Sequence, residues 1–482
     1  APPGLRLAEA ADGPGLWDVT GGALKPPVEL GKDSSYHAAG LSGWAWSLFE
    51  SGQFQQAADV FGRVVTEHPR QRETAAEAAY QRGQSLQAAD EMQGAVAAYQ
   101  QAFENFAPSD KDDADSQDDG AARYAFLAGL QAARGLRMLG NVEQADAAYA
   151  VVLGRFPRPA ELDKLLDEWA LLNYEAQRYE RADEIFKRLV QEVPDSDLAD
   201  DARLSLAESE LVARRYASAA KAFETLAAAA DSDDHVKEAA LFHLVEIGVE
   251  QRQWRQLEKT AQKFLDHFPE SPRRGEVAFR LAESRLNLNQ VQAAQEQLLD
   301  LKSRPPEGAD EALEWYQRVW VLLAETYFRE KKYDDVKRVL ADLHTRFPAS
   351  PVAYQGDEVL GRTFKNLAQF DEAREAFGRV LEDENARSTE TAAKCQFMIA
   401  ETHLLQEQYE DAQREYLKVY HLHKFPDWQA PALYQAGTCD EALEQWAAAV
   451  NTYELLVKEF GDTEFAAKGR ARLNDVRPKA AG

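Results

Sequence analysis

Five glutamates occupy the same place in a short segment that recurs along the chain. Four follow an alanine, in LAESEL, LAESRL, LAETYF and IAETHL, and one follows a valine, in LVEIGV. A series of like charges attracts a ligand of opposite charge, so these carboxylates could capture a basic or amine-rich partner. Alternatively, they pair with arginines of neighbouring repeats, such as Arg285 or Arg318, and only orient the repeats. The candidate partner-binding glutamates are Glu208, Glu246, Glu283, Glu325 and Glu401.

Aromatic side chains in the same segments form a second group of candidates. Phe242, Phe279 and Phe328 each lie a few residues from one of the glutamates. An aromatic side chain beside a charge suits the recognition of a peptide or a helix. The alternative is that these rings pack between repeats as part of the core.

No motif in the sequence indicates catalysis, a cofactor or a metal. His421 and His423 form an isolated pair without a third ligand. The six aspartates between residues 110 and 119 lack the ligand spacing of an EF-hand. Cys395 and Cys439 are the only cysteines, which is too few for a disulfide framework or a cysteine metal site, so we interpret them as small packing residues. The sequence therefore predicts no enzyme, no cofactor and no metal site.

The elements that position these residues are repeated helical hairpins. An aromatic or large apolar residue is followed by alanine three positions later and by a second aromatic residue seven positions later, as in AQFDEAREAF. We call the first of these residues the anchor, and most anchors recur at a nearly constant spacing. The anchors are Phe54, Met92, Val142, Tyr179, Tyr216, Trp254, Val291, Tyr333, Phe370, Tyr409 and Trp446.

Small residues and prolines complete each unit. Nine positions before the anchor the residue is Ala or Gly in every unit but one, where Val245 takes the place. Two helices approach closely only where a side chain is small, so this position predicts a contact between the two helices of a hairpin. Prolines fifteen positions after the anchor predict the end of the second helix, because proline breaks a helix. They are Pro69, Pro157, Pro194, Pro269 and Pro348.

This order of small residue, turn, aromatic residue, alanine, aromatic residue and proline resembles the tetratricopeptide repeat over about residues 35–462. The resemblance implies an all-α, right-handed α-solenoid of about eleven helical hairpins with a C-terminal capping helix. It also implies that the first helix of each hairpin lines a concave groove, and that the glutamates face this groove.

The spacing of the anchors is longer than the period of roughly 34 residues that is usual for this repeat. Units such as HFPESPRRGEVAFRLAESRLNLNQ resemble the long-loop variant found in bacterial envelope proteins. That subgroup includes outer-membrane-assembly lipoproteins and the Tol-Pal-associated cell-division coordinator. The resemblance implies a periplasmic or otherwise exported protein, with the cytoplasm as the alternative. A lipoprotein would begin with cysteine, whereas this chain begins with Ala1, Pro2 and Pro3, which fits a mature exported protein, removal of an initiator methionine before a small residue, or a trimmed chain.

Length, charge and apolar pattern constrain the rest. The chain has 482 residues and a net charge of −27, which disfavours nucleic acids and anionic membranes as partners. No apolar stretch is long enough to span a membrane, and we expect a soluble protein. We expect a Pro- and Gly-rich extended arm at residues 1–33, a solenoid at 34–462 with insertions near 108–119 and 304–314, and a capping helix and tail at 463–482.

The function that these observations favour is a protein-interaction scaffold. It would hold segments of one or more proteins, including basic segments, on an acidic concave surface within a cell-envelope assembly. One alternative is a factor that processes or positions cell-wall glycan, with Glu50 or the glutamate series acting in catalysis. Another alternative is a permanent structural subunit of a large complex.

Overall fold

The computed structural model describes residues 37–108, 120–305 and 313–481. These residues form 23 α-helices and no strand, which confirms the all-α solenoid fold class. The expected N-terminal arm and most of the two insertions, at residues 109–119 and 306–312, lie outside the described residues.

The helices pair into eleven hairpins, and each anchor is the first residue of a second helix. The pairs are α2 (His37–Glu50) with α3 (Phe54–Glu67), α4 (Arg72–Ala88) with α5 (Met92–Phe106), α6 (Gly120–Met138) with α7 (Val142–Arg155), α8 (Leu162–Glu175) with α9 (Tyr179–Glu192), α10 (Ala199–Val212) with α11 (Tyr216–Ala228), α12 (Asp234–Glu250) with α13 (Trp254–His267), α14 (Arg274–Asn287) with α15 (Val291–Ser303), α16 (Glu314–Arg329) with α17 (Tyr333–Arg346), α18 (Ala353–Asn366) with α19 (Phe370–Glu382), α20 (Glu390–Leu405) with α21 (Tyr409–Leu422), and α22 (Pro426–Ala442) with α23 (Trp446–Glu459).

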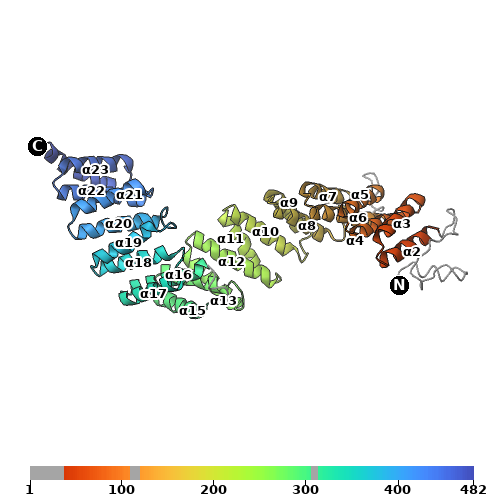
Figure 1. Ribbon diagram of the computed structural model, residues 1–482, viewed down its shortest axis with the longest axis horizontal. Coiled ribbons are helices and arrows are strands. Elements are labelled where there is room, and N and C mark those ends of the chain that lie inside the picture. The colour runs from red at the N-terminus through yellow and green to blue at the C-terminus, as the bar shows by residue number, and fades with distance from the viewer. Residues whose placement is uncertain (1–36, 109–119, 306–312, 482) are drawn as a thin grey trace. The chain divides into compact units, whose positions relative to one another are not determined.

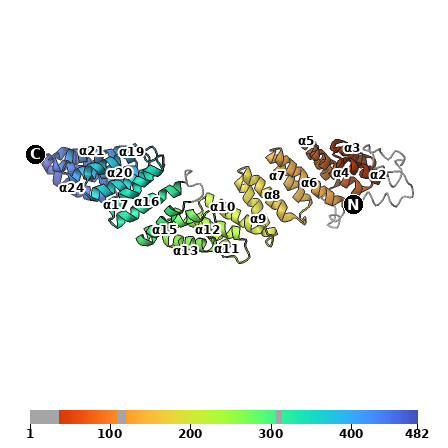
Figure 2. The same cartoon turned by 60° about the horizontal axis from the view of Figure 1, so that its bottom comes forward.

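The chain divides into two compact units. The first spans Ala1–Lys237 and the second spans Glu238–Gly482, so the boundary falls near the start of α12. Within each unit the hairpins follow one another in chain order, as the helix labels show (Figure 1, Figure 2). Each unit therefore has its own core between successive hairpins, and each is described separately.

The turn inside each hairpin has one shared conformation. The residue two positions before every anchor has a positive φ, a region that L-residues rarely adopt. The N–H of the next residue donates to the carbonyl five positions earlier, as from Gln369 to Phe364 at 2.9 Å. Only two of these residues are glycine. The positions are Gly52, Asp90, Gly140, Gln177, Arg214, Arg252, Asn289, Lys331, Ala368, Glu407 and Glu444.

Where the residue nine positions before the anchor is a glycine, it lies against the aromatic ring seven positions after the anchor. The ring of Phe377 lies so close to Gly361 that a Cβ added to this glycine would overlap the ring. The same holds for Gly437 under Tyr453. In the sixth hairpin the sizes are exchanged, because Val245 is the larger residue and Ala261 replaces the ring. Both of these are buried, which explains the single exception to the small-residue pattern.

The two ends of the hairpin pattern also agree with the sequence. The second helices that precede the five prolines end two residues before each of them, as α17 does at Arg346 before Pro348. The last element, α24 (Glu464–Ala480), packs against α22 and α23. Its Leu473 and Val476 are buried with Tyr453 and Leu456 of α23. This helix is the expected C-terminal cap.

Candidate functional site

The first helices form the inner layer of the second unit. Helix α14 packs on α16, α16 on α18, α18 on α20, and α20 on α22. Within the described chain, no second helix makes a comparable contact with the next second helix. Successive first helices therefore pack more closely than successive second helices. The exposed surface of the first helices forms the inner, concave side, which is the binding face that the resemblance implies.

A groove of about 290 Å³ crosses four of these first helices. Leu286 of α14, Val321 and Leu322 of α16 and Val359 of α18 supply its apolar part. Its charged lining is Glu283, Glu325, Glu358, Arg362 and Lys394, which is one more carboxylate than cation. The groove therefore combines apolar surface with a small surplus of negative charge, which suits a protein segment better than a nucleic acid.

Arg362 is the centre of the charged network in this groove. Its guanidinium lies 2.6 Å from Glu325 of the preceding hairpin and 2.8 Å from Glu358 of its own helix. Burial disfavours the charged form, but Glu358 and Glu325 outweigh this effect and raise the pKa of Arg362. Lys394 of α20 lies 2.6 Å from Glu358. The network therefore ties together three successive first helices.

Two further glutamates of the series also have cationic neighbours. Glu283 lies 3.1 Å from Arg280 of its own helix and 3.6 Å from Arg318 of the next hairpin. Glu401 lies 2.5 Å from Lys365 of the preceding hairpin. Arg285, the other arginine suggested as a partner, instead bonds to Gln297 and lies 3.7 Å from Glu258. Pairing with neighbouring repeats is thus present, through Arg318, Arg362 and Lys365, whereas the suggested role of Arg285 was wrong.

The remaining two glutamates of the series lie apart from the groove. Glu246 of α12 accepts a hydrogen bond from the ring nitrogen Nδ1 of His243 at 2.7 Å. Glu208 of α10 belongs to the first unit, where burial, and then the charge of Glu208, raises the pKa of Tyr174. The structure therefore brings together Glu283 and Glu325 in one groove, and it does not place all five glutamates on one described surface.

The three candidate phenylalanines differ in exposure. Phe279 is fully buried, with the guanidinium groups of Arg280 and Arg318 over its ring. Since no partner can reach a fully buried ring, its assignment to the binding surface was wrong, and it belongs to the core between repeats. Phe242 and Phe328 are partly exposed, but each carries a guanidinium over its ring, from Arg273 at 4.5 Å and Arg362 at 4.4 Å.

Asp167 of the first unit lies among other carboxyl groups. Burial raises the pKa of Asp167 on α8 to about 6, and the nearby charges of Asp201, Glu168 and Asp163 add to this shift. Burial makes the larger contribution to this raised pKa, and the neighbouring carboxylates add a smaller one. The sequence did not reveal that Asp167, Asp163, Glu168 and Asp201 lie close together, because Asp201 comes from the next hairpin.

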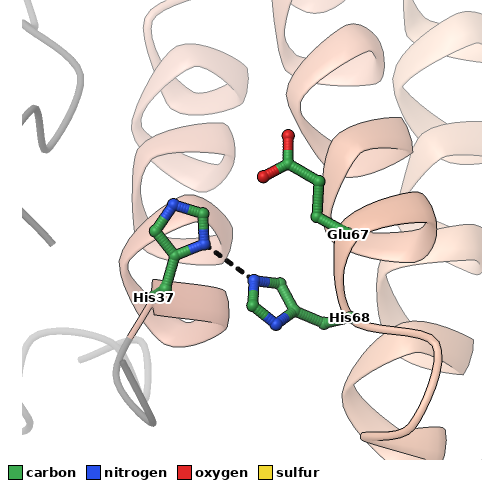
Figure 3. A group of neighbouring side chains, drawn as sticks. All are labelled: His37, Glu67 and His68. Atoms are coloured by element: carbon green, nitrogen blue, oxygen red, sulfur yellow. Dashed lines mark hydrogen bonds between the residues drawn. The ribbon is translucent and has the colours of Figure 1, made fainter. Parts of the chain in front are cut away.

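A histidine cluster in the first hairpin was also missed in the sequence. His37, Glu67 and His68 form the one group of three or more potential metal ligands within the described residues (Figure 3). His37 and His68 lie far apart in the sequence, so each looks like a scattered histidine there. The sequence did contain one signal for this cluster. His68 lies fourteen residues after its anchor, and several other repeats have phenylalanine at this position.

The two cysteines lie inside the helical core. Both are free and fully buried. Burial raises the pKa of the Cys439 thiol to about 12 and also raises that of Cys395. These thiols are therefore poor nucleophiles at neutral pH.

Helix length and apolarity bear on membrane insertion. Among the described residues, no helix is both long enough and apolar enough to cross a bilayer.

Comparison with protein families gives matches in three segments. Residues 43–110 and 168–235 match a family model described as tetratricopeptide repeat, and residues 431–463 match a second model with the same description. The three segments lie in both units of the chain. No curated protein matches the sequence.

Several solved structures share helical repeats with this chain at low identity. A tetratricopeptide repeat protein from Parabacteroides merdae is 13% identical with a TM-score of 0.43, over 57% of this chain and 99% of that chain. Yeast Tom70 is 12% identical with a TM-score of 0.39, over 92% of this chain and 96% of that chain. The pilF protein of Pseudomonas aeruginosa is 15% identical with a TM-score of 0.36, over 49% of this chain and 97% of that chain. Similarity at this level carries no conclusion about partners or function.

Proposed function

We propose that this chain, which contains tetratricopeptide repeats, is a noncatalytic scaffold that holds a segment of a partner protein on the inner face of its second unit. Tetratricopeptide-repeat proteins generally mediate interactions between proteins, and stacked repeats present extended concave surfaces for that purpose. The proposed site is the groove that crosses α14, α16, α18 and α20.

The composition of the groove lining carries this proposal. Its apolar side chains are 3–9% exposed and offer a small apolar surface to a partner, while its surplus carboxylate favours a basic residue beside them. Glu283 is the best placed of the glutamates for that residue, because its two ion pairs, 3.1 Å to Arg280 and 3.6 Å to Arg318, are longer than the 2.6 Å pairs of Glu325 and Glu358. The expected occupant is an extended or helical segment with apolar side chains and at least one Lys or Arg.

The other candidates are proposed as contacts outside this groove. Glu325 lines the groove but mainly holds Arg362, so its proposed role is to orient the lining. Glu246 and Glu401, with the partly exposed Phe242 and Phe328, would contact longer partners that extend beyond the groove within the second unit, and Glu208 would be a separate contact in the first unit. Each repeat would then add a modest contact, and several contacts together would hold one long partner.

Peptide selection followed by charge exchange tests the site. Peptides are selected from a phage-displayed random library on the full chain, and the affinity of the best synthetic peptide is measured by calorimetry. Gln355 lines the groove on α18 and is partly exposed, so its charge can be changed without breaking an ion pair. We expect Gln355→Lys to weaken binding and Gln355→Glu to strengthen it, each by about threefold to tenfold.

The matched control lies on the opposite layer of the same unit. Gln256 is exposed on the second helix α13, and its replacement by Lys or Glu is expected to leave the affinity unchanged. Equal effects at both glutamines would indicate only a long-range charge effect, and stronger binding to the Gln355→Lys chain would refute a basic occupant. Either result rejects the groove as the proposed site.

The proposed setting is a cell-envelope assembly outside the cytoplasm. This part of the proposal is supported by the long spacing of the anchors, as between Tyr179 and Tyr216, and by the loops that resemble envelope proteins. Fractionation of the source cells into cytoplasmic and envelope compartments, with immunodetection of the chain, tests it. Recovery with a cytoplasmic marker enzyme would contradict the envelope setting but leave the groove proposal intact.

A further inference from the structure

The end of the second helix holds a histidine in the first hairpin where several other hairpins hold phenylalanine. Phe156, Phe268, Phe347 and Phe460 are the residues that directly follow α7, α13, α17 and α23. His68 has the same place after α3. A phenylalanine would fill this position with apolar surface alone, so a histidine here introduces two ring nitrogens that need partners.

The partner of His68 is a second histidine from the start of the hairpin. His37 is the first residue of α2, and its Nδ1 lies 2.7 Å from Nε2 of His68. The two side chains are only 6% and 9% exposed. Figure 3 shows both rings in the space between the two helices, with the carboxylate of Glu67 reaching into the same space.

The carboxylate of Glu67 completes a set of three ligand atoms. Glu67 is the last residue of α3 and precedes His68 directly. One atom from each of His37, Glu67 and His68 lies within 4.8 Å of the other two. The Glu67 side chain is 17% exposed and also lies 3.0 Å from Arg63, so this carboxylate is held on the edge of the cluster.

We propose that His37, His68 and Glu67 bind one divalent transition-metal ion, and that the physiological ion is Zn²⁺. Two imidazoles and one carboxylate are a donor set that zinc prefers, with a water as the fourth ligand. Zinc–nitrogen bonds of about 2.0–2.1 Å place two tetrahedral ligand nitrogens about 3.3 Å apart. The two histidine nitrogens must therefore separate by about half an ångström from their hydrogen-bonded distance, a shift that side-chain torsions can supply.

The metal takes the place of the proton that joins the two rings. In the neutral pair, one of the facing nitrogens carries a proton and the other accepts it. When both facing nitrogens bind the ion, the ring that donated the hydrogen bond carries its proton on its other nitrogen instead. Zinc binding to the neutral pair thus exchanges a tautomer and releases no proton.

The site links the first residue of α2 to the end of α3. Within the described residues the α2–α3 hairpin has a neighbouring hairpin on one side only, so stacking there stabilises it less than a hairpin with two neighbours. A metal bound across this hairpin would stabilise it directly, because binding to the folded state adds its free energy to folding. The expected role is therefore structural, at the N-terminal hairpin of the first unit.

Zinc titration of the full chain tests the proposal. Isothermal titration with ZnCl₂ should give one site per chain, and hydrogen exchange in α2 and α3 should slow when zinc is present. His68→Phe places at this position the residue found in other hairpins, so the helices should stay folded while the site loses a ligand. We expect His68→Phe and His37→Ala to weaken binding by more than about 100-fold, and Glu67→Gln by about tenfold or more.

A matched histidine in another hairpin provides the control. His423 directly follows α21, is 9% exposed, and is replaced by phenylalanine in the same way. His423→Phe should leave the zinc isotherm and the protection of α2 and α3 unchanged. The proposal is overturned if wild-type chain binds no zinc, or if His423→Phe abolishes binding while His68→Phe, with unchanged helical circular dichroism, does not.

Discussion

At the scale of single residues, several hairpins are closed by a contact between a glycine and an aromatic ring. Gly361 of α18 lies against the ring of Phe377 on α19, with no room for a Cβ. Because both residues are fully enclosed, an added methyl group must displace the ring or the helix. We expect Gly361→Ala to lower the free energy of unfolding by about 1–3 kcal/mol, measured by urea denaturation.

A second glycine in the same hairpin separates packing from helix propensity. Gly378 of α19 has open space where its Cβ would lie. Gly378→Ala should therefore raise the free energy of unfolding, by about 0.5–1 kcal/mol, since alanine favours the helix. If both substitutions stabilise the chain, the contact between glycine and ring does not limit the packing of this hairpin.

Asp167 supplies the second test at this scale. Its folded pKa of about 6, raised by burial and by Asp201, Glu168 and Asp163, exceeds the ordinary value. A carboxyl group with a raised folded pKa destabilises the folded state when ionised, so its unfavourable effect is full above pH 6 and absent below about pH 4. Asp167→Asn should therefore stabilise the chain by about 1–2 kcal/mol at pH 7.5, after allowance for solvent screening, and by nothing measurable at pH 4.

The difference in stability between Asp167→Asn and the wild-type chain, followed across pH, separates the effect of Asp167 from that of other titrating groups. Thermal unfolding of both chains at a series of pH values gives the difference directly. A constant difference between pH 4 and pH 8 would mean that the charge of Asp167 is not the cause.

The sequence predicted the positions of the repeated residues better than it predicted the ion-pair partners of the glutamates. The anchors and the small residues follow a local pattern, so every one could be placed from the sequence. The partners of the glutamates could not, because Arg362, Arg318 and Lys365 come from adjacent hairpins whose side-chain geometry depends on the stack. Phe279 was misassigned for the same reason, since its burial depends on neighbouring repeats.

At the scale of elements, the turn between the two helices has the same backbone conformation in every hairpin, although its residues differ. Ala368 adopts a φ of 57° and is exposed, so its side chain gains nothing from packing. An L-residue in this region costs about 1 kcal/mol, and glycine removes that cost. We expect Ala368→Gly to raise the free energy of unfolding by about 0.5–1 kcal/mol in chemical denaturation.

The reciprocal change tests the same idea in the first unit. Gly140 has a φ of 75° and open space around a Cβ. Gly140→Ala should lower the free energy of unfolding by about 1 kcal/mol through backbone strain alone. Stabilisation by this alanine would show that the positive φ is not required.

The sequence predicted where each second helix begins but not how the turn is made. Aspartate, lysine, glutamate, glutamine and alanine all occupy the turn position. These residues do not signal a left-handed conformation on their own, so the conformation follows from the hydrogen bonds that close the turn.

At the scale of the whole molecule, each hairpin is stabilised by its contacts with the neighbouring hairpins. In a repeat array each hairpin contacts mainly its neighbours, so a local change should act locally. Removal of residues 463–482 uncovers Tyr453 and Leu456, which are fully buried beneath α24. Hydrogen exchange should then accelerate first in α22 and α23, with protection in α4–α7 unchanged.

A milder substitution controls for this truncation. Leu473→Ala on α24 should accelerate exchange in the same two helices, to a smaller extent, because a cavity weakens the cap without removing it. Loss of protection throughout the chain from either change would contradict nearest-neighbour stabilisation.

The net charge of −27 is a poor guide to the groove itself. Most carboxylates of the glutamate series in the second unit have cationic neighbours, and only a small surplus of negative charge remains in the groove lining. Composition therefore predicted which partners are disfavoured, while the character of the binding surface depends on side chains that only the folded repeats bring together.

Site-specific photocrosslinking in the source cells tests the central claim most directly. A benzophenone amino acid is placed at Gln355, in the groove, and separately at Gln256, on the outer layer. We expect a discrete crosslinked protein from position 355 whose contact segment contains apolar and basic residues, and no such product from position 256. No adduct at position 355, or the same adducts at both positions, would contradict a partner-binding groove on the inner face.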